Sequence, residues 1–107
     1  MYGYFNGEES AERMLGSGYE SPIYTCIIRW GDDPAVVGEE YATIYGSYHC
    51  MTTPLMTHVL TNASSSYPEL YASPSCQAVS SMLNTYYKNF LWSGNPNGGE
   101  LPQWDAW

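Results

Sequence analysis

His49 is the residue whose type and setting most directly suggest catalysis. It lies in the run 46–50, GSYHC, and a neutral imidazole can act as a general base beside a nucleophile. A histidine in a Tyr-rich loop is more often structural than catalytic, so residue type alone leaves both interpretations open. His58 carries no motif and is predicted to be a surface or packing residue. The two histidines are nine positions apart, which is not the spacing of two metal ligands on one helix.

The three cysteines also have types that could do chemistry. Cys26, Cys50 and Cys76 contain no CxxC spacing, so no zinc site is expected, and an odd number leaves at least one thiol outside any internal disulfide. Cys50 could pair with His49 as a nucleophile, but adjacent side chains rarely come within hydrogen-bonding distance, so we expect no such pair. Cys26 is predicted to be a buried, small apolar residue, and Cys76 a structural thiol at a helix start.

The other groups that ester hydrolysis requires are not found in this sequence. A serine nucleophile needs an imidazole base and a carboxylate that fixes the tautomer of the imidazole. No G-x-S-x-G motif occurs, and residues 16–18, GSG, are interpreted as a loop tripeptide. The acids that lie closest before His49 are predicted to be solvated turn and helix residues: Asp32, Asp33, Glu39 and Glu40.

Composition excludes several classes of partner. The net charge is −8, and the basic residues are Arg13, Arg29 and Lys88, so the cationic surface that nucleic acids and anionic membranes require is missing. No run approaches the ~20 apolar residues of a membrane span. No motif indicates a cofactor or a metal. Tyr accounts for 11 residues, and its apolar ring with a polar tip suits partly exposed faces and interfaces.

The elements that would position His49 can be predicted in outline. Residues 22–30 are rich in β-branched and aromatic side chains on both faces, which is typical of a central strand. Residues 74–92 carry a helical apolar stripe that begins after Ser73, a good N-cap, and ends before Gly94. The prediction for the whole chain is a helix at 8–16, a strand at 22–30, a loop around His49 at 46–57, a helix at 74–92 and an extended tail at 93–107.

Two segments resemble the type-B carboxylesterases and cholinesterases. Residues 82–104, MLNTYYKNFLWSGNPNGGELPQW, are similar to the terminal helix of that family and its N-F-x-x-x-G-N-P-N…L-P-x-W signature. Residues 46–54, GSYHCMTTP, resemble the family's G-[AS]-x-H-G-x-[DE]-x-P loop, whose histidine is catalytic. With residues 23–30, which look like the last core strand, the resemblance covers residues ~9–107.

The resemblance implies both a fold and a role. The fold would be α/β, as the C-terminal part of an α/β-hydrolase that is incomplete as a stand-alone domain. His49 would be the triad histidine, with the serine and the acid upstream of residue 1, because the histidine comes last in this fold. The chain alone is then expected to be inactive. Its partners would be the ester substrate of the parent enzyme and either the remainder of that chain or another copy, and the family is often secreted.

Departures from the family pattern support an alternative. Cys50 stands where the family has glycine, and Thr52 stands where it has an acid. These changes favour a catalytically dead, cholinesterase-like binding or adhesion protein.

A further alternative ignores the resemblance. The chain would be a small acidic, Tyr-rich carbohydrate-binding module built of paired strands. Aromatic residues that could stack on sugars are Tyr41, Tyr45, Tyr48, Trp92, Trp104 and Trp107, although such residues are more often core or interface. Residues 62–64, NAS, form a glycosylation sequon, a triplet that also arises by chance.

Overall fold

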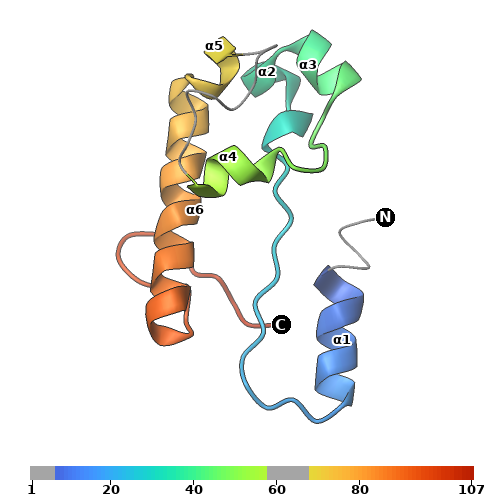
Figure 1. Cartoon of the computed structure of the whole chain (residues 1–107), viewed down its shortest axis with the longest axis vertical. Coiled ribbons are helices and arrows are strands. Elements are labelled where there is room, and N and C mark those ends of the chain that lie inside the picture. Colours follow the sequence, from blue (N-terminus) through green and yellow to red (C-terminus); the bar gives the residue numbers. More distant parts are fainter. Residues whose placement is uncertain (1–6, 58–67) are drawn as a thin grey trace. The chain divides into compact units, whose positions relative to one another are not determined.

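The chain divides into two compact units. The computed structural model describes residues 7–57 and 68–107, so His58 and the sequon at 62–64 lie outside the described residues. One unit contains the described residues before position 28 together with 102–107, and the other contains residues 28–101 without the gap. Figure 1 labels the helices in chain order.

The prediction of an α/β fold with a core strand at 22–30 is wrong. The described residues contain helices and no strand, and residues 22–29 are irregular until a 3-10 turn, η2, begins at Trp30. A strand needs a neighbour for its backbone N–H and C=O groups. No ladder forms along 22–29 within the described residues, and Ile27 is 64% exposed. The residues of the segment favour a strand, but within residues 7–57 and 68–107 no neighbouring strand pairs with it.

The first unit contains a short helix, the irregular segment that follows it, and the last six residues of the tail. Helix α1 spans Glu9–Gly16, within one residue of the predicted range, and buries Ala11. The Trp104 indole N–H donates to the Thr25 carbonyl over 3.0 Å, and its ring meets Tyr24 edge-on at a centroid distance of 6.3 Å. The tail is therefore attached by an aromatic anchor within this unit.

The second unit is a set of short helices against one long helix. η2 spans Trp30–Asp32, α2 Pro34–Val37, α3 Glu39–Ile44, α4 Thr52–Thr57, α5 Pro68–Tyr71 and α6 Pro74–Ser93. Helix α6 covers the range predicted for it. The Ser73 hydroxyl accepts from the Cys76 N–H, and Gly94 closes the helix with a left-handed φ of 74°, as the capping residues predict.

The core of the second unit lies between α6 and the shorter helices. Its buried side chains are Trp30, Val37, Tyr41, Met51, Leu55, Tyr71 and Cys76. Helix α4 lies against α6 (Figure 1). The Leu55 carbonyl at this contact accepts hydrogen bonds from the Ser80 hydroxyl at 2.7 Å and the Asn84 amide at 2.9 Å. These polar bonds fix α4, and with it the loop that carries His49.

None of the described helices has both the length and the apolar composition needed to cross a membrane. This agrees with the prediction that the sequence contains no membrane span.

Candidate functional site

His49 lies in an exposed turn between α3 and α4. The beginning of this turn is held by η2. Gly46 passes so close to Gly31 that a Cβ at position 31 would collide with the Gly46 carbonyl. The Asp32 carboxylate accepts from the Ser47 N–H over 2.7 Å and pairs with the Arg29 guanidinium at 2.8 Å. The Arg29 hydrogen bond, followed by that from Ser47, lowers the pKa of Asp32 below its usual range.

Tyrosine hydroxyl groups hold the next part of the turn. Tyr71 is fully buried at the end of α5, and its hydroxyl lies 3.2 Å from that of Tyr48 and 3.4 Å from that of Tyr41. Burial raises the pKa of Tyr71 well above that of an ordinary phenol. Met51, which follows the site, is also buried. Residues on both sides of His49 and Cys50 are therefore anchored, while these two are exposed.

Cys50 has an unusual backbone conformation. Its φ is 71°, and it is the one non-glycine residue with positive φ in the part of the chain that the structure describes. Left-handed backbone places the Cβ of an L-residue close to the following carbonyl, which is why glycine is the usual residue there. Cys50 is the position at which the sequence departs from the family's glycine.

The thiol and the imidazole are in contact in this turn. Cys50 Sγ lies 3.0 Å from His49 Nδ1 and 3.8 Å from Nε2. The expectation that these adjacent side chains would not reach each other is wrong. The contact occurs together with the left-handed backbone of Cys50. Nothing in the sequence indicated this backbone conformation. A neutral imidazole with Nδ1 unprotonated can accept the thiol proton.

The acidic residues near the turn have structural roles. Asp32 binds Arg29 and Ser47 as described above. Asp33 caps α2 by accepting from the Ala35 N–H over 2.9 Å, and Glu39 and Glu40 lie in the first turn of α3, where acids interact favourably with the helix dipole. These assignments agree with their interpretation as turn and helix residues.

The other two cysteines differ from each other and from Cys50. Cys76 is buried in the first turn of α6, and burial raises its pKa to about 11, which favours a structural thiol over an activated one. Cys26 is exposed, so its prediction as a buried apolar residue is wrong. All three are free thiols in the structure. No group of three or more His, Cys, Asp or Glu within residues 7–57 and 68–107 could hold a metal ion.

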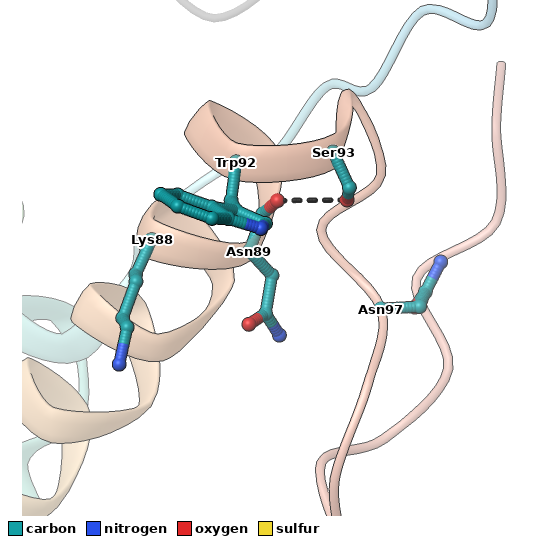
Figure 2. Close-up of a pocket in the computed structure, with 5 residues that line it drawn as sticks. All are labelled: Lys88, Asn89, Trp92, Ser93 and Asn97. Atoms are coloured by element: carbon teal, nitrogen blue, oxygen red, sulfur yellow. Dashed lines mark hydrogen bonds between the residues drawn. The ribbon is translucent and has the colours of Figure 1, made fainter.

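A second feature lies at the end of α6. A shallow pocket of about 350 Å³ is lined by Lys88, Asn89, Trp92, Ser93 and Asn97 (Figure 2). The Ser93 hydroxyl donates to the Asn89 carbonyl over 2.9 Å, and the Asn89 amide donates to the Pro96 carbonyl over 3.0 Å. These bonds give a structural reason for part of the family-like signature, because Asn89 holds the turn that contains Pro96.

Sequence reasoning missed the tyrosine cluster. Tyr41 and Tyr45 are one helical turn apart, and their rings stack obliquely at a centroid distance of 5.4 Å. The spacing of Tyr41 and Tyr45 predicts that they lie on the same face of a helix. Nothing in the sequence indicated that the Tyr71 hydroxyl would lie beside those of Tyr41 and Tyr48.

Comparisons of the chain with family models, with curated proteins and with solved structures found no match.

Proposed function

We propose that this chain is the C-terminal portion of a serine carboxylic-ester hydrolase of the type-B carboxylesterase kind, and that His49 is its general base and acid. The observation that carries the proposal is the backbone of Cys50. The family-like motif requires glycine at this position, and the φ of 71° is the conformation that glycine adopts most readily. A left-handed residue directly after His49 supports the comparison with the family-like motif, although the glycine itself is replaced.

The setting of His49 supports the same role. A general base must be accessible to the substrate yet held in place by its surroundings. His49 is exposed in a turn that is anchored by Asp32 through Ser47 and by Tyr71 through Tyr48. The imidazole can therefore meet a group from outside this chain while its backbone stays fixed.

The chemistry divides between this chain and residues outside it. A serine hydroxyl would attack the ester carbon while the His49 imidazole takes its proton. The imidazolium would then return that proton to the leaving alcohol. The serine, the carboxylate and the oxyanion-hole donors belong to other residues of the proposed protein, because the sequence contains no G-x-S-x-G motif.

The first test uses the isolated chain. Purified chain and its His49→Ala variant are mixed with p-nitrophenyl acetate, and steady-state turnover is followed after any initial burst. We expect the same low steady rate for both. Continued His49-dependent turnover would show that a nucleophile for multiple rounds of hydrolysis exists within these residues, and it would overturn the proposal.

A longer protein that contains this chain gives the complementary test. There, His49→Ala should lower kcat by a factor on the order of 10⁵–10⁶, as loss of the triad histidine does in serine hydrolases. His58→Ala is the matched control, since His58 carries no motif, and it should leave kcat unchanged. Equal activity of the His49→Ala protein would exclude His49 as the base.

The contact between Cys50 and His49 favours a second candidate function. In a Ser-His-Asp triad, Nδ1–H donates to the carboxylate, whereas here Cys50 Sγ lies 3.0 Å from Nδ1. A thiol at the position of the acid is what a catalytically dead binding or adhesion protein would tolerate. The longer protein separates the two candidates. An intact G-x-S-x-G with ester turnover supports the hydrolase, and a replaced serine with no turnover supports the binding protein.

The carbohydrate-binding alternative predicted many paired strands. Residues 7–57 and 68–107 contain helices and no strand, which counts against this alternative and also removes the single core strand predicted for the hydrolase.

The exposed end of α6 supports an association surface in either candidate function. Tyr87, Phe90, Leu91 and Trp92 are exposed there, Leu91 by 67% and Trp92 by 92%. Exposed apolar groups in one patch are typical of a contact surface. We propose that the remainder of a longer protein covers this end, because two copies of the chain would each bring a net charge of −8.

Light scattering of the isolated chain tests this association. At low salt, the like charges should keep the isolated chain monomeric even at high protein concentration. Self-association should appear only as added salt screens these charges, and it should decrease in Leu91→Ser. Strong self-association at low salt would mean that a second copy covers this end, and it would contradict docking on the remainder.

A further inference from the structure

Cys50 and His49 form a nucleophile and a base in contact, and this arrangement needs no residue from outside the chain. Cys50 Sγ lies 3.0 Å from His49 Nδ1, and both side chains are exposed. A thiol becomes a strong nucleophile when a neighbouring base removes its proton. The same contact that complicates a serine triad thus creates a different reactive centre.

We propose that Cys50 is an acyl acceptor activated by His49, and that its substrates are activated acyl donors, namely esters and thioesters with good leaving groups. This inference goes beyond the proposed hydrolase, and it stands or falls without it.

The proposed reaction is a single acyl transfer. The Cys50 thiol gives its proton to His49 Nδ1, and the sulfur attacks the acyl carbon. An S–C bond forms as the C–O or C–S bond to the leaving group breaks. The leaving group takes the proton back from the imidazolium, directly or through solvent. The products are a thioester on Cys50, a free alcohol or thiol, and a neutral His49.

The surroundings of Cys50 explain why the reaction should stop at the acylated thiol. Rapid hydrolysis of an acyl-enzyme requires backbone or side-chain donors for the oxyanion. Two of the N–H groups that follow the nucleophile are already used in the turn, since Met51 N–H donates to the Tyr48 carbonyl at 3.2 Å and Thr53 N–H donates to the Cys50 carbonyl at 3.1 Å. We therefore expect one equivalent of acylation rather than turnover.

The chain contains its own comparison thiol. Cys26 is exposed like Cys50, although burial raises the pKa of its thiol. The effect of the imidazole is therefore read from the change in the ratio of the Cys50 and Cys26 rates in His49→Ala. Cys76 is buried, with a pKa raised to about 11, so it should react last. Relative labelling of the three thiols in one molecule therefore reports the effect of the imidazole without differences in protein concentration.

The experiment follows acetylation of the reduced 107-residue chain by p-nitrophenyl acetate at pH 7. Burst release of p-nitrophenolate gives the rate, and peptide mass spectrometry with brief sampling assigns the acetyl group. Cys50 should be acetylated about 10-fold or more faster than Cys26, within the range of general-base catalysis. The His49→Ala variant should lose this advantage, and Cys50→Ser should lose the fast burst.

Two further measurements exclude a trivial effect of exposure. The rate at Cys50 should depend on pH differently in the parent chain and in His49→Ala, because the variant lacks the neighbouring base. In 6 M urea, the ratio of the Cys50 and Cys26 rates should fall, because the contact depends on the folded turn. The proposal is overturned if the two thiols react equally in the folded chain, or if His49→Ala leaves their ratio unchanged. Steady turnover after the burst that is lost in Cys50→Ser would contradict the expected stop at the acylated thiol. Turnover that persists in Cys50→Ser but is lost in His49→Ala bears on the hydrolase proposal instead.

Discussion

The two ends of α6 have similar apolar content and very different surroundings. At the N-terminal end, Cys76 and Ser80 are buried beneath α4 and α5. At the C-terminal end, Leu91 and Trp92 are largely exposed. The packed end includes the contact with Leu55, which in turn fixes α4 beside the His49 turn.

The two ends of α6 show that sharing a helix face and being buried are separate properties. Helical periodicity predicts which side chains share a face. It does not predict what covers that face, because burial depends on segments far away in the sequence. Val79 and Leu83, nearer the start of the stripe, pack on the core, while Phe90 and Leu91, nearer its end, are exposed. An exposed end of this kind is consistent with a chain that completes its packing on other residues.

The largest expected effect is on stability, and it compares a leucine that packs against the buried end of α6 with a leucine at its exposed end. Leu55→Ala should lower the free energy of unfolding by about 2–5 kcal/mol, since it removes a fully buried side chain and leaves a cavity. Leu91→Ala should change it by less than about 0.5 kcal/mol, as for other exposed positions. Urea denaturation at low protein concentration measures both. Equal losses would mean that the exposed end is covered, for example by a second copy.

Two glycine substitutions test whether the close contact between Gly31 and Gly46 positions the His49 turn. Gly31→Ala should destabilise the chain by about 1–3 kcal/mol, because its Cβ meets the Gly46 carbonyl. Gly94→Ala, at the exposed end, meets no atom within 4 Å and should cost about 1 kcal/mol through its left-handed backbone alone. Amide chemical shifts of residues 46–51 give the decisive readout. They should move in the first variant and stay unchanged in the second.

The bounds of α6 show how far the sequence could lead. Ser73, Pro74 and Gly94 define α6 through local capping rules, so its range could be predicted from neighbouring residues. The strand at 22–30 could not be tested by such rules. Its β-forming residues state a preference, while a sheet requires a neighbouring strand that supplies hydrogen bonds. The failure lies in tertiary context rather than in the reading of composition.

The candidate site divides in the same way. The sequence identified His49 and the departure at Cys50, because both belong to one short motif. It could not reveal the contact between their side chains, which accompanies a backbone angle at Cys50. It also missed Tyr71, whose hydroxyl meets that of Tyr48 from 23 positions away. Contacts between segments so distant in sequence depend on packing that a single sequence does not encode visibly.

Cys50 itself gives the next prediction. Cys50→Gly should be more stable than Cys50→Ala by about 1 kcal/mol, because a Cβ in the left-handed region costs about that much. Both variants remove the thiol, so their difference isolates the backbone. Urea denaturation measures it. An alanine variant as stable as the glycine variant would remove the backbone argument that links this turn to the family's glycine.

The smallest effect is confined to alkaline pH and concerns the packed end. The folded chain raises the pKa of Cys76 from 9.0 to about 11 through burial, so the folded state holds this proton more tightly than the unfolded state does. The resulting stability is complete below pH 9 and is lost as pH rises toward 11. Tyr41 and Tyr71 have raised pKa values as well, and they add losses of the same sign above pH 10.

Urea denaturation from pH 8 to pH 11 measures this dependence. The Cys76→Ala variant should start from a lower stability and lose less between pH 9 and 10, before the tyrosines contribute. Leu55→Ala is the matched control, because it also lowers stability at a buried site but removes no titratable group, and it should keep the slope of the parent chain. A Cys76→Ala variant with the parent slope would mean that the buried thiol does not link pH to folding, and that the packed end is open to solvent like the other end of α6.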